Sequence, residues 1–266
     1  KKILIGAIIN SVSWDTIYNL KLFIMLKSLK IKKCCFFYPF EGYAHEKIIN
    51  FCFKNNINLI IGYQHTILYK NTNLLGKLNH KYFPDIILSS SYYYLKKLKK
   101  NLVSKIQIIK FGKKINKIIK KKTINRILVI PEGDVYEVNY FINFLKKYLY
   151  HYSSTKFTLR IHPVFKFNRK KLNNIFKNFS DRLKISKRSF AKDISNHNIS
   201  LYSGSSAIVD CVRHNHIPVY LNIRSKYVNN PLYEINNKIF EVKSEKDLNT
   251  FTTSKYLKYK RNCFFV

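Results

Sequence analysis

Five short stretches place a carboxylate, an amide or imidazole, or a hydroxyl directly after an apolar run. They are Glu41-Gly42, Gln64-His65, Glu132-Gly133-Asp134, His162-Pro163 and Ser203-Gly204-Ser205-Ser206. In open α/β sheets, ligands bind outside the carboxyl ends of the strands. A carboxylate there can deprotonate a hydroxyl, and an imidazole can donate to a phosphate oxygen. The coincidence of five such ends predicts a ligand site.

The turn at residues 203–206 separates an apolar run from a helix-like segment. Gly204 permits close backbone approach, Ser205 and Ser206 supply hydroxyls, and a helix from about Ala207 would present free N–H groups. Together these features predict a phosphate cradle. An ordinary serine N-cap is the alternative. The turn lacks both the glycine pattern and the lysine of the common nucleotide-binding loops.

His162 is followed by Pro163, which restricts the backbone and would hold the imidazole at the end of a strand. There it can stabilise a leaving phosphate, although a purely structural histidine is the alternative.

Glu41 and Glu132 each precede a glycine, and each can serve as a base or bind a sugar hydroxyl. Capping of the following helix is the alternative for both. No acidic pair with metal-binding spacing follows a strand, so we predict a site without metal or cofactor.

These groups need strands to position them, and the sequence supplies short apolar runs that alternate with helix-like segments. In the first half the predicted strands are 2–9, 33–40, 57–65, 85–91 and 106–111. In the second half they are 126–133, 157–163, 182–186, 199–203, 217–223 and 238–242. Their nearly continuous apolar character is typical of buried parallel strands.

The two series of strands are separated by the lysine-rich segment 112–125, which has the polarity of a linker. We therefore predict an α/β protein with two Rossmann-like parallel-sheet domains that face each other across a cleft. The predicted domains are residues 1–121 and 122–266.

Composition narrows the class of protein. An apolar content of 46% predicts a folded globular chain, and no apolar run is long enough to span a bilayer. The net charge of +35 is compatible with an anionic membrane surface, but its dispersal and the excess of Lys, Asn, Ile, Tyr and Phe are also explained by codon bias. The five cysteines have no metal-ligand spacing, so we expect mostly buried, reduced thiols in a cytoplasmic protein.

Taken in order, several blocks resemble bacterial surface carbohydrate biosynthesis proteins, which are GT-B-type glycosyltransferases. The blocks are FEGYAHEKII (40–49), GYQHT (62–66), ILVIPEGDVYE (127–137), LRIHP (159–163) and YSGSSAIVD (202–210) followed by IPVYL (217–221). The last three are also similar to CMP-sugar-using transferases of the sialyltransferase-like and Kdo-transferase-like kinds. The resemblance covers most of the chain.

The resemblance implies a role for each domain and each block. Domain 1–121 would lie on the acceptor side, and domain 122–266 would bind the nucleotide-sugar. His162, Ser205 and Ser206 would hold the donor phosphate, Glu132 and Gly133 would lie against the nucleotide, and Glu41 would be the base. The acidic-acidic-Gly motif of the sialyltransferase-like enzymes reads Phe40-Glu41-Gly42 here, with one acid missing. The chain is also short for a two-domain transferase, so we expect part of the N-terminal domain to be absent.

These observations predict a metal-independent glycosyltransferase that moves a sugar from a nucleotide-activated donor, a CMP-sugar, to a surface glycan or lipid-linked precursor. Gln64 and His65 are predicted on the acceptor side, and the enzyme is expected at the inner face of the plasma membrane. One alternative is a nucleic-acid-binding protein, for which tyrosines 92–94 beside the lysines of 96–100 are the nearest signal. The charge is dispersed and no binding module appears, so no nucleic-acid partner is expected. A nucleotide-sugar epimerase-like enzyme of the same architecture is the other alternative.

Overall fold

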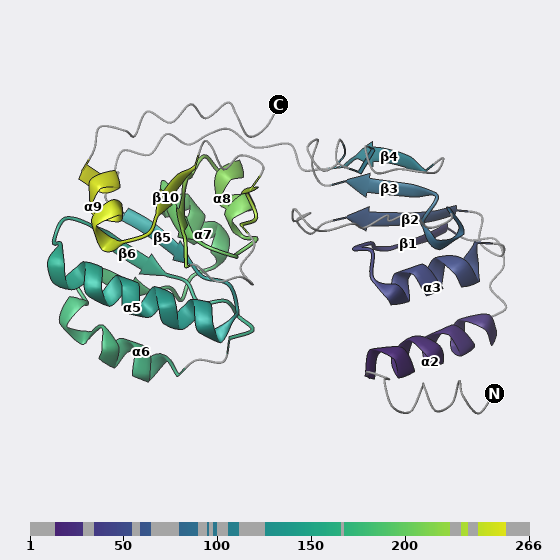
Figure 1. The fold of residues 1–266 in the computed structure, drawn as a ribbon, viewed down its shortest axis with the longest axis horizontal. Coiled ribbons are helices and arrows are strands. Elements are labelled where there is room, and N and C mark those ends of the chain that lie inside the picture. The colour runs from purple at the N-terminus through teal and green to yellow at the C-terminus, as the bar shows by residue number, and fades with distance from the viewer. Residues whose placement is uncertain are drawn as a thin grey trace. The chain divides into compact units, whose positions relative to one another are not determined.

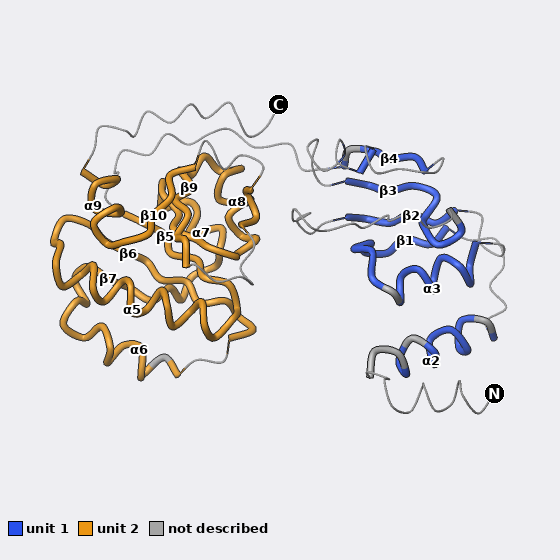
Figure 2. The backbone as a smooth tube through the Cα atoms, in the orientation of Figure 1, with its two compact units in different colours: residues 1–66, 71–113 blue, residues 67–70, 114–266 orange. Residues whose placement is uncertain are grey.

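A computed structural model describes residues 14–28, 35–54, 59–64, 80–89, 95, 98–99, 106–111, 126–165, 168–223, 230–233 and 239–253. The chain divides into two compact units, which are described separately (Figure 2). Unit 1 comprises residues 1–66 and 71–113, and unit 2 comprises residues 67–70 and 114–266. The predicted domain boundary after residue 121 and the predicted strand 2–9 lie outside the described residues.

In the described part of unit 1, a parallel sheet has the strand order β1-β2-β3-β4 (Figure 1). The strands are β1 (Cys35–Pro39), β2 (Leu59–Gln64), β3 (Ile86–Ser89) and β4 (Gln107–Lys110). Helix α3 (Ala44–Phe53) follows β1 and packs against α2 (Trp14–Ser28) and the 3-10 turn η1 (His80–Tyr82). All four strands lie within predicted runs.

Unit 2 contains a parallel sheet with the order β10-β9-β8-β5-β6-β7 among the described strands. These are β5 (Arg126–Ile130), β6 (Lys156–Leu159), β7 (Leu183–Ile185), β8 (Ile199–Tyr202), β9 (Ile217–Leu221) and β10 (Phe240–Val242). Between and after them lie α5 (Val135–His151), α6 (Arg169–Ile175), η2 (Lys177–Phe179), α7 (Phe190–Asn196), α8 (Ile208–Arg213) and α9 (Glu245–Thr253). Each predicted strand of the second half is present, with shorter bounds.

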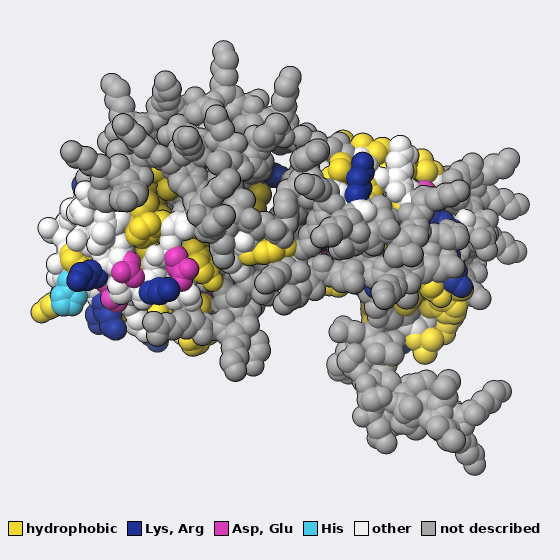
Figure 3. All heavy atoms as spheres, turned by 45° about the horizontal axis from the view of Figure 1, so that its top comes forward, with side chains coloured by type: hydrophobic (Ala, Val, Ile, Leu, Met, Phe, Trp, Pro, Cys, Tyr) yellow, Lys and Arg dark blue, Asp and Glu magenta, His cyan; other side chains and the backbone are white. Residues whose placement is uncertain are grey.

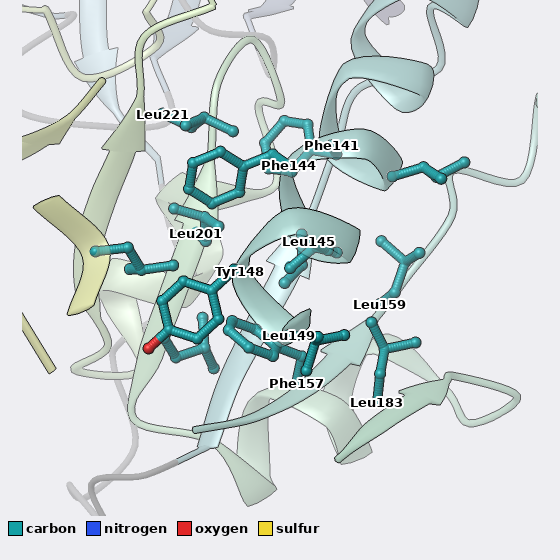
Figure 4. Packing of buried hydrophobic residues seen from close by; sticks show 14 of the residues in the cluster. Phe141, Phe144, Leu145, Tyr148, Leu149, Phe157, Leu159, Leu183, Leu201 and Leu221 are labelled. Atoms are coloured by element: carbon teal, nitrogen blue, oxygen red, sulfur yellow. The ribbon is translucent and has the colours of Figure 1, made fainter. Parts of the chain in front are cut away.

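The core of unit 2 is built where α5 packs on one face of the sheet. Figure 4 shows Phe141, Phe144, Leu145, Tyr148 and Leu149 of α5 directed toward strand residues. The labelled partners on the strands are Phe157, Leu159, Leu183, Leu201 and Leu221. The helix presents this face because its apolar residues recur at intervals of three and four.

The opposite face of the same sheet is covered as well. Leu128, Ile130 and Tyr202 of the strands pack there with Ile194 of α7 and Ile208 of α8. A sheet buried on both faces explains why its strands are continuously apolar rather than alternating. The prediction of an α/β fold with buried parallel strands is therefore confirmed.

The surface of the described residues carries both basic and acidic side chains. On the face seen in Figure 3, Lys and Arg side chains of unit 2 lie beside Asp and Glu side chains, and other basic side chains lie on unit 1.

Among the described cysteines, only Cys211 is buried, whereas Cys52 is half-buried and Cys35 is exposed. The expectation of mostly buried thiols is therefore wrong for Cys35, because the side chain lies at an exposed position of β1. None of the helices in the described ranges combines the length and apolar character needed to cross a membrane.

Candidate functional site

Three of the five predicted stretches follow strands that are neighbours in the sheet of unit 2. Strand β5 pairs with β6 on one side and with β8 on the other. Glu132, His162 and the turn at 203–206 follow β5, β6 and β8, respectively. The chain proceeds from β5 to β6 and β7 in one direction, and the later strands extend the sheet from the other side of β5. The carboxyl ends of β5 and β8 therefore form a topological switch point, the usual ligand position in such sheets.

The corner after β5 is organised by Asp134 and Glu137. Asp134 is the N-cap of α5, and its side chain accepts a hydrogen bond from the Glu137 N–H at 2.9 Å. The Glu132 N–H donates to Glu137 Oε1 at 2.9 Å. The alternative that Glu132 caps the helix is thus wrong, because Asp134 occupies that position. The Glu132 side chain is left for another role.

Glu137 is a functional candidate that the sequence reasoning missed. It is fully buried, and its carboxylate also accepts from the Gly204 N–H, at 3.4 Å to Oε1 and 3.3 Å to Oε2. Burial raises the pKa of Glu137 to about 7, against the lowering effect of the Glu132 and Gly204 N–H groups. Burial also raises the pKa of Glu132, with a contribution from Asp134. The available sequence signal was the Asp134-x-x-Glu137 spacing, which is typical of a helix start.

Two glycines allow these groups to approach one another. A Cβ atom on Gly204 would lie 2.3 Å from Glu132 Oε2 and 3.0 Å from Glu137 Oε2. A Cβ atom on Gly133 would lie 3.1 Å from His162 Nδ1. The structure therefore brings the Glu132 corner, His162 and the turn after β8 into one site.

His162 lies in a turn rather than in the strand. Strand β6 ends at Leu159, three residues earlier than the imidazole, so the predicted strand 157–163 is too long. The His162 side chain is exposed, and its Nδ1 accepts a hydrogen bond from the Val164 N–H at 3.3 Å. In the neutral ring an accepting Nδ1 leaves the proton on Nε2, which can donate to an anion. Pro163 is exposed next to it.

The loop before His162 is fixed by a partly buried ion pair. Arg160 donates to Asp193 Oδ2 at 2.7 Å, and Asp193 is 2% exposed. The Ser186 hydroxyl donates to the same oxygen at 2.6 Å. Arg160 therefore joins the end of β6 to helix α7, two residues before the imidazole.

The turn after β8 differs from the predicted cradle. Ser203, Gly204 and Ser205 are buried, and Ser206 is exposed. Helix α8 has Ala207 as its N-cap, and no side chain of the described residues caps it. The serine-cap alternative is therefore wrong.

The prediction of free N–H groups at the start of α8 is wrong for Ile208 and Val209. The Ile208 N–H donates to the Ser205 carbonyl at 3.3 Å, and the Val209 N–H donates to the Ser206 carbonyl at 3.1 Å. The Gly204 N–H is bound to Glu137. A phosphate at this turn would therefore depend on the serine hydroxyls rather than on these three amides.

Unit 1 holds the other two stretches. The Glu41 N–H donates to both carboxylate oxygens of Glu46, each at 2.9 Å, and Gly42 has the positive φ of 81° that favours glycine. Capping by Glu41 is again wrong, because Glu46 bonds the N–H groups at this helix start. Gln64 is fully buried and accepts from the Ser89 hydroxyl at 3.4 Å, which places its side chain inside the unit. His65 lies outside the described residues.

Within the described ranges, no group of three or more His, Cys, Asp or Glu side chains is placed to hold a metal ion. The chemistry that the unit 2 site offers consists of two carboxyl groups, an imidazole and serine hydroxyls.

No family model and no curated protein matches the sequence. The structure is similar to S. aureus MnaA with UDP, at a TM-score of 0.56 and 10% identity over 91% of this chain and 72% of that one. It is also similar to the Methanocaldococcus jannaschii UDP-GlcNAc 2-epimerase with UDP-GlcNAc and UDP, at a TM-score of 0.55 and 11% identity over 92% and 75%.

A third similar structure is the pneumococcal O-GlcNAc transferase GtfA with UDP and GlcNAc, at a TM-score of 0.51 and 10% identity over 88% of this chain. The chain spans about half the length of the matched transferases, 52% of GtfA and 44% of S. aureus TarM. These likenesses and the two parallel sheets show that the chain has the GT-B type of fold.

Proposed function

We propose that this chain is a glycosyltransferase that binds a nucleotide-sugar at the carboxyl ends of β5, β6 and β8. The observation that carries the proposal is the convergence of Glu132, His162 and the turn at 203–206 at the switch point of the sheet. A nucleotide-sugar needs hydrogen-bond acceptors for its ribose hydroxyls and hydrogen-bond donors for its phosphate. The Glu132 carboxylate would accept from the ribose hydroxyls. His162 Nε2 and the hydroxyls of Ser205 and Ser206 would donate to the phosphate.

The donor that we propose is a CMP-sugar, because the His162-Pro163 and Ser205-Ser206 pairs resemble those of CMP-sugar-using transferases. As the phosphate departs, negative charge grows on its oxygens, and a donor aimed at that charge lowers the barrier. Glu41 of unit 1 would deprotonate the acceptor hydroxyl, with His65 on the acceptor side. Gln64, whose side chain is buried, would support this region from inside the unit. The acceptor would be a surface glycan or its lipid-linked precursor at an anionic membrane. Neither a metal nor a cofactor enters this scheme.

The fold also supports a second candidate, a nucleotide-sugar epimerase-like enzyme. The chain covers 75% of the M. jannaschii epimerase but only 52% of the GtfA transferase. An epimerase would convert the sugar of the donor without any acceptor. Glu132, whose pKa is raised, would be its candidate acid or base.

Thermal shift with CMP, UDP, GDP and ADP tests the site, because a ligand that binds the native state raises the melting temperature. We expect the largest shift with CMP. A larger shift with UDP would mean that the donor is a UDP-sugar rather than a CMP-sugar, and no shift with any nucleotide would refute the site.

Incubation of CMP- and UDP-sugars with and without glycan acceptors separates transfer from epimerisation. Transfer that EDTA abolishes and magnesium restores would contradict the metal-free scheme.

A further inference from the structure

The same corner is built in both units. In EGYAHE (41–46) and EGDVYE (132–137), a Glu-Gly pair follows a strand, and a second glutamate stands five residues after the first. Glu46 and Glu137 both lie in the first turn of a helix and are 3% and 0% exposed. Each accepts the N–H of the first glutamate at 2.9 Å. The buried glutamate therefore has a local role that is common to the two units, which is to fix the backbone of the Glu-Gly pair.

Among the described residues, a second, long-range hydrogen bond is made by the buried glutamate of unit 2 and not by that of unit 1. Glu137 also accepts the N–H of Gly204, 67 residues further along the chain. One carboxylate thus joins the loop after β5 to the loop after β8, which are the two loops of the switch point. A buried carboxylate costs free energy unless it is hydrogen-bonded, and here it is bonded to both loops.

The crowding at Gly204 shows how closely this contact fixes the site. The position of a Cβ atom on Gly204 lies within 3.0 Å of oxygens from both Glu132 and Glu137. The Glu132 side chain, although exposed, therefore lies with its carboxylate directly against Gly204. Displacement of Glu137 would release the Gly204 amide and, with it, the part of the turn against which the Glu132 carboxylate lies.

We infer that Glu137 is a positioning residue that clamps the loops after β5 and β8 in the geometry that binds the nucleotide. This inference rests on the proposed function of the same site. Glu137 itself is buried beneath the loops, so its effect on the nucleotide passes through Glu132 and the turn at 203–206.

The test compares the wild-type protein with Glu137→Ala, Glu137→Gln and the matched control Glu46→Ala. Affinity for CMP, with UDP as a second probe, is measured by calorimetry at a temperature at which every variant is folded. Glu137→Ala should weaken binding at least tenfold, and Glu137→Gln, which keeps one oxygen acceptor, should weaken it about threefold. Glu46→Ala removes the same local contact in unit 1 and should leave nucleotide affinity unchanged.

Amide hydrogen exchange gives a second measurement that needs no nucleotide. Peptides that cover residues 203–206 should exchange at least tenfold faster in Glu137→Ala than in the wild type, and Glu46→Ala should not change them. If Glu137→Ala does not fold, Glu137→Gln decides alone, and wild-type affinity in that variant overturns the inference.

The outcomes separate the inference from the proposed function. If the wild-type protein binds neither CMP nor UDP, the proposed function is wrong and the inference falls with it. If the wild type binds CMP and Glu137→Ala binds it equally well, the inference alone is wrong. An equal loss of affinity in Glu46→Ala also overturns it, because the effect would then come from general loosening of the protein.

Discussion

Gly133 and His162 approach each other so closely that a Cβ atom on Gly133 would lie 3.1 Å from the imidazole Nδ1. The loop after β5 and the loop after β6 are therefore in direct contact, and the histidine lies beside the Glu132 corner. This contact, together with the exposure of His162, makes the imidazole available to a ligand that lies over β5.

Replacement of His162 by alanine should reduce catalysis more than stability. Loss of one donor to a developing negative charge typically costs about 10²- to 10³-fold in rate. We expect a reduction of that order in the release of CMP from a CMP-sugar, with weaker CMP binding. The melting temperature should change little, because the side chain is exposed.

His151→Ala is the control for this experiment, since His151 is an exposed histidine in the last turn of α5. It should retain wild-type turnover. Near-normal turnover in His162→Ala, or loss of its fold, would show that the imidazole serves packing instead.

Replacement of Gly204 by alanine should damage the site through the two carboxyl groups around it. The added methyl group would lie 2.3 Å from Glu132 Oε2, and the exposed Glu132 side chain must move away. It would also lie 3.0 Å from Oε2 of the fully buried Glu137, which has no room to move. Overpacking of this kind typically costs about 1–3 kcal/mol, and we expect that loss together with loss of nucleotide binding. Urea unfolding and calorimetry measure the two effects.

Gly133→Ala provides a graded comparison, because its new methyl group would meet His162 at the longer distance of 3.1 Å. The loss of stability should be smaller than that in Gly204→Ala. Equal stability and binding in the wild type and Gly204→Ala would contradict the close packing of Glu132 on this turn.

The raised pKa of Glu137 predicts a pH dependence of stability. Its pKa rises from 4.5 to about 7 on folding, so the folded state favours the protonated form. The stability that this group contributes is complete below pH 4.5 and is lost as the pH rises through about 7. One unit of pKa difference corresponds to about 1.4 kcal/mol.

Glu137→Gln removes the titration, so the difference in unfolding free energy between wild type and variant should change between about pH 5 and pH 7. The wild type should lose stability relative to the variant across that range, as measured by urea unfolding at several pH values. A constant difference would show that Glu137 has an ordinary pKa.

Replacement of Asp193 by alanine should destabilise unit 2 strongly. The change leaves Arg160 without its carboxylate and removes the acceptor of the Ser186 hydroxyl. Loss of one partner of a buried ion pair costs about 3–5 kcal/mol, and we expect about 2–4 because the Arg160 side chain is 23% exposed.

Asp210→Ala is the control, because the Asp210–Arg213 pair lies at the surface, where the Asp210 side chain is 51% exposed. Its cost should be below about 1 kcal/mol. Thermal unfolding compares the two variants, and similar small losses in both would mean that the Arg160–Asp193 pair does not hold the end of β6.

The strands of both units could be predicted from sequence because buried parallel strands consist of short apolar runs, and such runs are local features. Ile127, Leu128 and Val129 of β5, for example, are all fully buried. The prediction failed at strand ends. Strand β6 ends at Leu159. The Arg160 N–H still donates to the Val129 carbonyl of β5, but the Arg160 side chain pairs with Asp193 of α7. No local pattern encodes that partner.

The sequence by itself determined which side chains follow the strands, since a strand end is marked by the residues on either side of it. The strand order was decided only by the tertiary structure, which places β8 and β6 on the two sides of β5 and so brings Gly204 and His162 to Glu132. The role of Glu137 depends on the same long-range contact. The raised pKa of Glu137 and its hydrogen bond to Gly204 both follow from its burial. Burial depends on packing between segments that are distant in sequence, so neighbouring residues do not encode it.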